Sequence, residues 1–425
     1  MTRSLYEVGM APPLGHVPER MYASVIRPDR FGPPAEAFRT ETVPVPEVPP
    51  GHVLVYVMAA GINFNNVWAA LGQPVDVIAQ RRRLGLTDDH HIGGSDGAGI
   101  VWAVGESVRT VAVGDHVIMS ACRWDESADD IRLGADPMTS STQRVWGYED
   151  NFGAFAQFTV VADYQCIPKP AGLTWEEAAA FLLTAATAYR QLTGWPPNTV
   201  QPADPVLIWG GAGGLGSMAI QIVRALGGIP VAVVSSEEKA GYCRKLGALT
   251  LNRTEFSHWG RPPDAADTEG FDAWLAGVRA FGRRYWEVLG SRRAPRVVLE
   301  HPGQDTLPTS LYLCDTAGMV VICGATTGFQ ADVDLRFLWM RQKRLQGSHF
   351  ANVRQCRAVV HLAATGRLDP CLSLVETFEH IGYVHQLLYE NRQPPGNMAV
   401  LIGAPETGLT SAAPGSIGGS ASDTR

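Results

Sequence analysis

A glycine-rich turn follows a strongly apolar segment near the middle of the chain. Segment 206–209, Val-Leu-Ile-Trp, has the composition of a buried strand, and a helix is predicted over 217–226. Between them, Gly211, Gly213 and Gly216 have the spacing Gly-x-Gly-x-x-Gly. Such glycines allow a tight turn and a close backbone approach, so that amides at the helix start can face a pyrophosphate. The sequence therefore predicts a dinucleotide pocket lined by Gly211, Gly213, Gly214, Leu215 and Gly216.

The residues after the next predicted strand, 229–234, bear on the choice between NADH and NADPH. An NAD-preferring site usually carries a carboxylate here to hold the ribose 2′-hydroxyl, whereas this chain has Ser235. The hydroxyl favours NADPH. Lys239 and Arg244 follow and could pair with a 2′-phosphate. The two glutamates between Ser235 and Lys239 oppose that interpretation, and ordinary surface charge explains both cations equally well.

The composition is that of a soluble α/β enzyme. The 425 residues are 45% hydrophobic and 18% charged, with 45 glycines, and suffice for two domains with separate cores. The net charge of −7 argues against a nucleic-acid partner, because such a partner usually binds a basic surface. No apolar stretch approaches the length of a membrane span, and the N-terminus carries no apolar signal region. We therefore expect a cytoplasmic protein with no membrane partner.

The cysteines indicate neither a disulfide framework nor a structural zinc site. The seven thiols are scattered along the chain, and none belongs to a Cys-x-x-Cys pair. This spacing is typical of reduced thiols in an intracellular protein. We therefore expect free cysteines and no bound metal.

The first part of the chain predicts a small β-rich domain. Its first forty residues are rich in proline and arginine and are interpreted as an extended cover. Short apolar runs separated by glycine then predict strands at 51–58, 99–105 and 113–118. Segment 168–194 is predicted to be helical, with a capping box formed by Thr174 and Glu177. We expect this helical segment to connect two domains.

The second part predicts a doubly wound parallel sheet. Strands and helices alternate from Val206 to His349, with further strands predicted near Val231, Leu249, Val297 and Met319. A helix at 353–365 and a strand at 397–402 are expected to return to the first domain. The predicted domains are 1–195 (catalytic), 196–349 (cofactor-binding) and 350–410 (the return), and a disordered tail is predicted at 411–425.

Several uncommon segments resemble one enzyme family. The domain order resembles the medium-chain dehydrogenase/reductase superfamily, which pairs a GroES-like catalytic domain with a Rossmann cofactor domain. Within it, four segments resemble the crotonyl-CoA carboxylase/reductases: Val-Trp-Gly-Tyr-Glu-Asp-Asn-Phe-Gly at 145–153, Leu-Thr-Trp-Glu-Glu-Ala-Ala at 173–179, Glu-His-Pro-Gly at 300–303 and Gln-Gly-Ser-His-Phe-Ala-Asn at 346–352. The resemblance extends from Gly51 to Leu409 and implies an α/β fold, with His301 among the cofactor contacts.

Two positions separate the chain from zinc-dependent members of the superfamily. Where alcohol dehydrogenases carry a cysteine and a histidine ligand, this chain has Asn63 and Ser95. Amide and hydroxyl groups are poor zinc ligands beside thiolate and imidazole. Hydride transfer would then proceed without a metal, which suits an enoyl thioester whose own carbonyl delocalises the charge.

The family resemblance implies reductive carboxylation. NADPH would deliver a hydride to the β-carbon of a 2-enoyl-CoA, and the α-carbon of the enolate would attack CO2. Crotonyl-CoA giving ethylmalonyl-CoA is the default pair, either in central carbon assimilation or in the supply of polyketide extender units. The CO2 pocket of the family maps onto Asn65, Tyr148, Glu149 and His349. Asn65 and His349 would donate hydrogen bonds to the CO2 oxygens, and Glu149 would orient the other groups.

Each pocket residue also has an ordinary interpretation. Without the resemblance, Glu149 is more often a solvated loop acid, and His349 is more often a hydrogen-bonded histidine without a catalytic role. Asn65 could be a loop residue that bonds nearby backbone, and Tyr148 could form only a wall of the pocket. For Glu149, the motif shared with the family favours the catalytic interpretation.

The resemblance also implies how the thioester is held. Arg279 and Arg336 lie where the family keeps cations for the CoA nucleotide. The chain has Thr-Ala-Gly at 316–318 where relatives often have Lys-Gly-Gly, and Trp286 where some have arginine, so an acyl carrier protein stays an alternative carrier. Phe350 could close the acyl pocket, which favours a short acyl chain.

Two other functions remain compatible with the sequence. A zinc-independent enoyl-thioester or quinone reductase would use the same glycine turn but would protonate the enolate. A non-catalytic NADPH-binding protein of the superfamily is the other, and retention of all four pocket side chains argues against it. By resemblance, we expect a homodimer or homotetramer in which edge strands at 319–323 pair.

Overall fold

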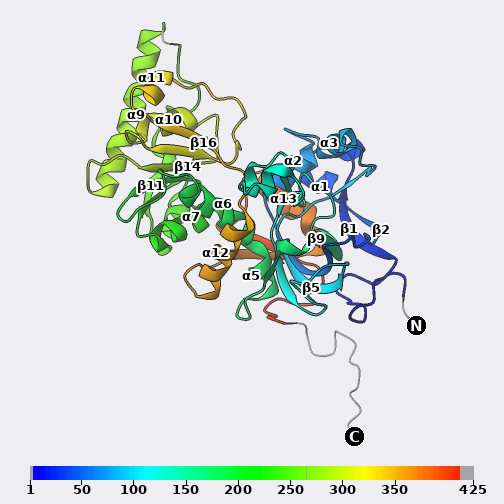
Figure 1. The fold of residues 1–425 in the computed structure, drawn as a ribbon. Helices are drawn as coiled ribbons and strands as arrows, with labels where there is room; N and C mark the ends of the chain where they lie inside the picture. The colour runs from blue at the N-terminus through cyan, green and yellow to red at the C-terminus, as the bar shows by residue number, and fades with distance from the viewer. Residues whose placement is uncertain (1–2, 265, 412–425) are drawn as a thin grey trace. The chain divides into compact units, whose positions relative to one another are not determined.

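The computed structural model describes residues 3–264 and 266–411 and divides into two compact units (Figure 1). Of the described residues, the first unit comprises 3–183, 352–365 and 370–411. The second unit comprises 184–264, 266–351 and 366–369. The division falls inside helix α6 (Leu182–Thr193). The first boundary expected from the sequence, at residue 195, lies just beyond the end of this helix.

A seven-stranded sheet forms the centre of the first unit. Its strands are β3 (His52–Gly61), β5 (Gly97–Val104), β6 (His116–Met119), β9 (Phe158–Ala162), β10 (Cys166–Pro168), β17 (Leu372–Thr377) and β18 (Asn397–Leu401). The order is β10-β6-β5-β3-β18-β17, with β9 also paired to β3, and only β17 and β18 are parallel. The predicted glycine-separated runs form β3, β5 and β6. The strand predicted at 397–402 returns to this sheet, because β18 pairs with β3.

The N-terminal segment is more regular than the expected extended cover. Strands β1 (Arg20–Ile26) and β2 (Arg39–Pro44) pair antiparallel, and β1 also pairs with β4 (His91–Ile92). The prolines of this region lie before β1, between β1 and β2, or at the end of β2, where no interior ladder hydrogen bond is lost. A two-stranded ribbon, β7 (Cys122–Arg123) with β8 (Arg144–Val145), leads into the loop that carries Tyr148.

Short helices cover the first unit. They are α1 (Pro34–Ala37), α2 (Asn65–Leu71), α3 (Val77–Arg83), α4 (Asp129–Arg132), α5 (Trp175–Ala180), α12 (Val353–Ala364) and α13 (Ile381–Tyr389), with 3-10 turns at Pro28–Arg30, Pro137–Thr139, Asp163–Gln165 and Phe378–His380. The predicted capping box is confirmed, because Thr174 Oγ1 accepts from the Glu177 N–H at 3.2 Å and Glu177 Oε2 accepts from the Thr174 N–H at 2.9 Å. The segment predicted as helical forms two helices, α5 and α6. Near the junction between them, the Leu183 N–H donates to the Asp96 side chain and not to a carbonyl of α5.

The residues after the last strand stay attached to the first unit. The backbone oxygens of Leu409 and Ser411 accept from the backbone and indole N–H groups of Trp175, at 2.9 and 3.2 Å. Thr410 O accepts from Lys169 Nζ at 2.9 Å. These bonds fix the chain as far as Ser411, the first residue of the predicted disordered tail, and the remainder of that tail lies outside the described residues.

A six-stranded parallel sheet forms the second unit, as the alternation of strands and helices predicts. Its strands are β11 (Pro205–Trp209), β12 (Ile229–Val234), β13 (Leu249–Asn252), β14 (Val297–Glu300), β15 (Met319–Ile322) and β16 (Arg344–Gly347). The order β13-β12-β11-β14-β15-β16 reverses between β11 and β14, where doubly wound sheets bind their ligands. The prediction that 319–323 forms an edge strand is wrong, because β15 is paired on both sides, with β14 and β16, and β16 lies at the edge.

Helices cover both faces of this sheet. Leu207 and Trp209 of β11 share a buried cluster with Phe281 of α9 (Thr268–Leu289) and Leu311 of α10 (Leu307–Leu313). Alternate residues of a strand face opposite sides, and α7 (Gly214–Ala225) contacts β11 and β12 from the other side. Figure 1 shows α7 and α9 on opposite sides of the strands. The unit also contains α8 (Glu237–Lys245), α11 (Leu335–Trp339) and a 3-10 turn at Arg253–Glu255.

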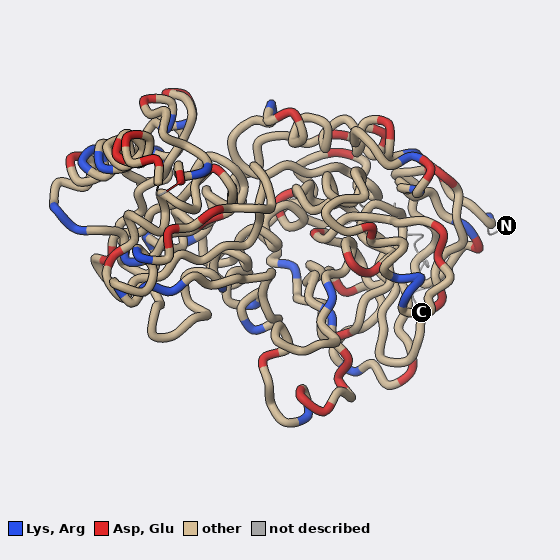
Figure 2. The backbone as a smooth tube through the Cα atoms, turned by 90° about the horizontal axis from the view of Figure 1, so that it is seen from above, with Lys and Arg blue, Asp and Glu red and all other residues tan. Residues whose placement is uncertain are grey.

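Charged residues of both signs are spread along the backbone of each unit (Figure 2). The chain has 35 Lys and Arg against 42 Asp and Glu, so neither sign dominates. Among the described residues, no helix is both long and apolar enough to cross a membrane. The cytoplasmic location and the absence of a nucleic-acid partner stay predictions.

Candidate active site

Asn65 begins α2 and lies in a small network of amide and hydroxyl groups. Asn65 Nδ2 donates to Ser95 Oγ at 2.8 Å, and Asn65 Oδ1 accepts from Asn66 Nδ2 at 3.0 Å. Asn66 Oδ1 in turn accepts from the backbone N–H of Gly94 at 3.2 Å. Asn66 and Ser95 are buried, whereas Asn65 is half-buried. The Asn65 side chain is therefore held by two hydrogen bonds to buried residues while part of its own surface stays exposed.

Tyr148 and Glu149 lie in the turn after β8. Glu149 Oε2 accepts a hydrogen bond from the backbone N–H of Val145 at 2.8 Å, so the carboxylate closes its own turn. Tyr148 is 9% exposed, and its burial, together with the Glu149 charge, raises the pKa of the phenol to about 12. The Tyr148 hydroxyl therefore stays protonated at neutral pH and can donate a hydrogen bond.

Close backbone contacts join this turn to the Asn65 network. Gly147 has a positive φ of 72°, and a Cβ there would overlap the carbonyl oxygen of Gly94. A Cβ at Gly153 would overlap the carbonyl of Gly93 in the same way. Only glycine allows this approach. The structure thus brings three of the predicted pocket residues, Asn65, Tyr148 and Glu149, onto one framework in the first unit.

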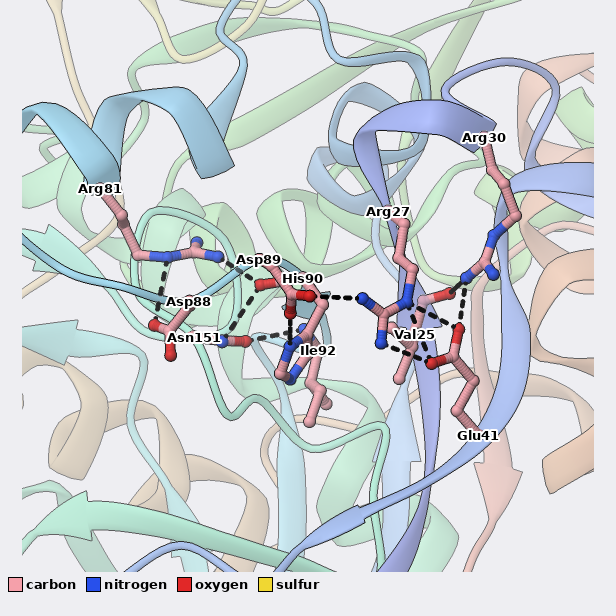
Figure 3. A network of polar contacts seen from close by, with 10 residues as sticks. All are labelled: Val25, Arg27, Arg30, Glu41, Arg81, Asp88, Asp89, His90, Ile92 and Asn151. Carbon is pink, nitrogen blue, oxygen red and sulfur yellow. Dashed lines mark hydrogen bonds and ion pairs between the residues drawn. The ribbon is translucent and has the colours of Figure 1, made fainter.

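A buried arginine contacts the turn, and Figure 3 shows its contacts with Asp88 and His90. Arg81 of α3 is 2% exposed, and its guanidinium donates to His90 O at 2.8 Å and to Glu149 O at 3.4 Å. It also contacts His91 Nδ1 at 3.2 Å. Burial lowers the pKa of His91 well below its usual range, and the Arg81 charge acts in the same direction. The His91 ring is therefore neutral, and its Nδ1 accepts the hydrogen bond.

An asparagine and an ion-pair network complete this support (Figure 3). Asn151 Oδ1 accepts from the Ile92 N–H at 2.8 Å, and Asn151 Nδ2 donates to His90 O at 3.2 Å. Further along the same network, the Arg27 guanidinium bridges Glu41 at 2.8 Å and Asp89 at 2.9 Å. Hydrogen bonding to Arg27 holds the pKa of Glu41 below its usual value. These contacts connect the turn to the N-terminal sheet.

Sequence reasoning missed Arg81, Asn66 and Asn151. Arg81 stands in a run of three arginines, a pattern typical of a solvated surface. A weak signal exists, because Arg81 follows the apolar Val77 and Ile78 at helical spacing, and these are the buried residues of α3. Asn66 and Asn151 lie next to predicted residues, but nothing in their spacing separates them from ordinary loop amides.

The predicted glycine turn lies between β11 and α7 in the second unit. Gly210 has φ of +58°, and α7 begins at Gly214 with Gly213 at its N-cap. A Cβ at Gly216 would overlap the Gly210 carbonyl, and one at Gly211 would overlap the Ala232 side chain. The backbone is therefore packed in the way a dinucleotide turn requires, and the first-turn amides of α7 face outward from the helix start.

The residues predicted to bind a 2′-phosphate follow β12. Ser235 and Lys239 are half-buried, and Ser236 Oγ caps α8 by accepting from the Lys239 N–H at 3.2 Å. Arg244 pairs with Glu237 and donates to Thr250 Oγ1 at 3.2 Å. Arg244 would have to exchange its carboxylate partner to hold a phosphate, so Ser235 and Lys239 are the better placed candidates.

His301 packs directly against the glycine turn. Its Nε2 lies 3.2 Å from Trp209 O, and a Cβ at Gly210 would overlap the ring. Burial lowers the pKa of His301 to about 4, so the ring is neutral. The preceding residue, Glu300, is buried and accepts hydrogen bonds from Thr306 Oγ1 at 2.7 Å and Ser310 Oγ at 2.6 Å. Burial raises the pKa of Glu300 to about 7.

The remaining predicted residues belong to the second unit. Arg279 of α9 is exposed, with its Nε 3.4 Å from Tyr312 OH. Arg336 of α11 is exposed and pairs with Asp334 at 2.6 Å. His349 is exposed and follows β16, and the next residue, Phe350, is 4% exposed with φ of +51°. The structure therefore does not place these residues on the framework that carries Asn65.

The positions compared with zinc ligands have no zinc-binding chemistry. Ser95 accepts the Asn65 hydrogen bond, and Asn63 is buried beside Asp96. Burial raises the pKa of Asp96 well above its usual range, offset in part by the hydrogen bond from the Leu183 N–H. Within the described residues, no group of three His, Cys, Asp or Glu side chains could hold a metal ion. The amide and hydroxyl at these positions do not fit zinc.

Comparison with known families finds two domain models. Residues 49–171 match the alcohol dehydrogenase GroES-like domain, and residues 214–365 match the zinc-binding dehydrogenase model. The first range lies within the first unit, around its seven-stranded sheet, and the second begins at α7 of the parallel sheet. These matches agree with the predicted α/β fold, a GroES-like domain joined to a Rossmann domain.

Individual relatives narrow the assignment. The chain is 47% identical over 408 residues to a crotonyl-CoA carboxylase/reductase of Cereibacter sphaeroides, covering 96% of this chain and 93% of that protein. The structure of the crotonyl-CoA carboxylase/reductase AntE in complex with NADP has a TM-score of 0.92 and 65% identity, covering 95% of this chain and 100% of that one. The 2-octenoyl-CoA carboxylase reductase CinF of a Streptomyces, in complex with NADP and 2-octenoyl-CoA, has a TM-score of 0.85 and 37% identity, covering 94% and 91%. The chain belongs to the crotonyl-CoA carboxylase/reductase family of the medium-chain dehydrogenase/reductase superfamily.

Proposed function

We propose that the protein is an NADPH-dependent enoyl-CoA carboxylase/reductase, which adds hydride and CO2 to a 2-enoyl-CoA and forms an alkylmalonyl-CoA. The observation that carries the proposal is the common framework of Asn65, Tyr148 and Glu149, whose backbone segments meet at Gly94 and Gly147. Relatives that match 94–96% of this chain are named for carboxylase/reductase activity on enoyl-CoA thioesters, and two of them are structures with NADP.

The glycine turn fits the cofactor. Its backbone is packed so closely that a Cβ at Gly211 or Gly216 would overlap a neighbour, and the start of α7 is free to face a pyrophosphate. Ser235 and Lys239 are the residues that would hold a 2′-phosphate, because no carboxylate follows β12 directly. Bound NADPH would supply a hydride to the β-carbon of the thioester.

The pocket residues would act on CO2 and on water. Asn65 donates an N–H toward the CO2 oxygens, where negative charge develops as the enolate α-carbon forms the new bond. The buried Tyr148 adds a wall and a neutral hydroxyl donor. Glu149 fixes the turn through the Val145 N–H, and His349 supplies a further donor. Exclusion of water matters because protonation of the enolate would give the plain reduced thioester.

The acyl chain is proposed to be short. Phe350 is bulky, buried and held in a left-handed backbone conformation, which suits a residue that closes the end of an acyl pocket. Crotonyl-CoA is therefore the default substrate and ethylmalonyl-CoA the default product.

Arg279 and Arg336 are exposed cations that would hold the CoA nucleotide. An acyl carrier protein is the alternative carrier, and a homodimer or homotetramer is the proposed assembly.

The test is an NADPH oxidation assay with crotonyl-CoA, run with and without bicarbonate plus carbonic anhydrase, with products resolved by mass. We expect ethylmalonyl-CoA in the presence of CO2. Butyryl-CoA alone at saturating CO2 would contradict the proposal and indicate an enoyl reductase without carboxylation. If crotonyl-CoA is not turned over, hexenoyl-CoA, octenoyl-CoA and the crotonyl carrier-protein thioester are tested in the same assay, and failure of all of them would contradict the proposal.

A further inference from the structure

Two buried polar side chains hold the amide of Asn65 from opposite ends. Asn66 Nδ2 donates to Asn65 Oδ1 at 3.0 Å, and Asn65 Nδ2 donates to Ser95 Oγ at 2.8 Å. Ser95 is 1% exposed and Asn66 is 0% exposed, so neither can contact a substrate directly. Asn65 itself is half-buried. Ser95 and Asn66 can therefore act on a ligand only through Asn65.

The direction of these hydrogen bonds follows from a backbone group. The Gly94 N–H can only donate, and it donates to Asn66 Oδ1 at 3.2 Å. A Cβ at Gly93 would overlap the same oxygen, so Asn66 is closely packed at that end. Asn66 Nδ2 must then face Asn65, whose oxygen accepts. Turning the Asn65 amide by 180° would set two NH2 groups against each other.

The fixed orientation of the Asn65 amide leaves one N–H of its Nδ2 without a hydrogen-bond partner among the described residues. Asn65 Oδ1 and one N–H of its Nδ2 are engaged by Asn66 and Ser95. Within the described part of the chain, the second N–H of Nδ2 has no acceptor. A free N–H attracts an oxygen that gains negative charge, whereas a free carbonyl oxygen would repel it. The geometry therefore specifies which end of the amide a ligand meets.

We propose that Asn66 and Ser95 are positioning residues that present an N–H of Asn65, and not its oxygen, to CO2. This inference rests on the proposed function, in which Asn65 stabilises the developing carboxylate. Ser95 stands where zinc-dependent relatives carry a histidine ligand. In this chain, the hydroxyl at that position orients an amide.

The experiment uses the full-length enzyme and the variants Ser95→Ala, Ser95→Thr, Asn65→Ala and the double variant Asn65→Ala with Ser95→Ala. NADPH oxidation with crotonyl-CoA is measured at increasing CO2, and products are resolved by mass. We expect Ser95→Ala to raise the KM for CO2 about fivefold to tenfold, the scale of one hydrogen bond. NADPH oxidation without CO2 should stay within about twofold of wild type, which shows that the variant folds and binds both substrates. Ser95→Thr keeps the hydroxyl and should restore the low KM.

The double variant decides whether Ser95 acts through Asn65. If it does, adding Ser95→Ala to Asn65→Ala raises the KM for CO2 no further. An additive effect, or an unchanged KM in Ser95→Ala, would overturn the positioning role and leave the proposed function standing. A wild-type enzyme that forms no carboxylated product would overturn the proposed function and this inference with it. Ser120→Ala is the matched control, because it removes another buried hydroxyl, which contacts Cys122 and Cys356, and should leave the KM unchanged.

Discussion

Asn151 Oδ1 accepts a hydrogen bond from the backbone N–H of Ile92 at 2.8 Å. The bond joins the turn that carries Glu149 to strand β4, immediately before the glycines on which that turn packs. Asn151 Nδ2 also donates to the carbonyl oxygen of His90, just before this strand, at 3.2 Å, so one side chain serves as both acceptor and donor for two backbone groups. Asn151 is 8% exposed, and water cannot readily replace it.

Asn151→Ala should therefore lower both stability and carboxylation. The substitution leaves the Ile92 N–H buried without an acceptor, which costs about 1–3 kcal/mol. The turn then loses its tie to β4, and we expect a larger share of plain reduced product at a fixed CO2 concentration. Urea unfolding and product analysis by mass measure the two effects. Asn397→Ala is the control, because it removes another buried asparagine hydrogen bond, to Pro370 O at 2.7 Å, outside the site. Equal product ratios in both variants would contradict the prediction.

Glu149→Ala should shift the product from carboxylated to reduced thioester. Loss of the carboxylate frees the Val145 N–H and loosens the turn that carries Tyr148, and misplacement of pocket groups costs on the order of 10- to 100-fold in rate. Glu149→Gln keeps an acceptor for Val145, so we expect a smaller shift. His349→Ala should move the product ratio in the same direction as Glu149→Ala. The assay compares ethylmalonyl-CoA with butyryl-CoA at equal NADPH consumption, and an unchanged ratio in Glu149→Ala would rule out its role.

The parts of the fold that sequence predicts correctly depend on local patterns. The glycine turn at 211–216 needs only one strand and the helix that follows it, and the capping box needs only Thr174 and Glu177. The sheet of β1 and β4 joins residues about sixty-six positions apart, and no local pattern gives such a register. The edge position of β16 likewise depends on the order of the whole sheet.

The candidate site likewise has residues that the sequence identifies and contacts that only the structure shows. The resemblance of uncommon sequence segments to one enzyme family identifies Asn65, Tyr148 and Glu149 as candidate pocket residues. What orients them is not readable along the chain: Arg81 reaches Glu149 O across sixty-eight positions. The sequence identifies Ser95 only as a poor zinc ligand, since its role as acceptor for Asn65 depends on a contact between residues thirty positions apart. Burial of charge and amide groups is a property of packing, which spacing does not encode.

Glu300→Gln should change how stability depends on pH. Burial raises the pKa of Glu300 from 4.5 to about 7, so between these values the folded state binds a proton that the unfolded state has lost. Stability from this group is therefore present below pH 4.5 and is lost as pH rises to 7. The difference of about 2.5 in pKa corresponds to about 3 kcal/mol.

A glutamine side chain cannot ionise, so Glu300→Gln removes this loss of stability. The unfolding free energy of the variant, minus that of wild type, should rise by about 2–3 kcal/mol between pH 5 and pH 8. Hydrogen bonds from Thr306 and Ser310 that change with the substitution contribute equally at both pH values, so the difference isolates the titration. Urea unfolding at the two pH values measures it, and a difference independent of pH would show that Glu300 does not titrate in this range.

Phe350→Ala should extend the acyl range of the enzyme. Phe350 is buried with φ of +51°, a conformation that costs energy for a bulky side chain, so the surrounding chain holds the ring in place. If the ring closes the acyl pocket, its removal opens space for several methylenes, each worth about 0.8 kcal/mol when buried. We expect kcat/KM for 2-hexenoyl-CoA and 2-octenoyl-CoA, relative to crotonyl-CoA, to rise about tenfold or more. Phe350→Leu keeps most of the volume and should retain the preference for crotonyl-CoA. Wild-type selectivity in Phe350→Ala would place the end of the acyl pocket at another residue.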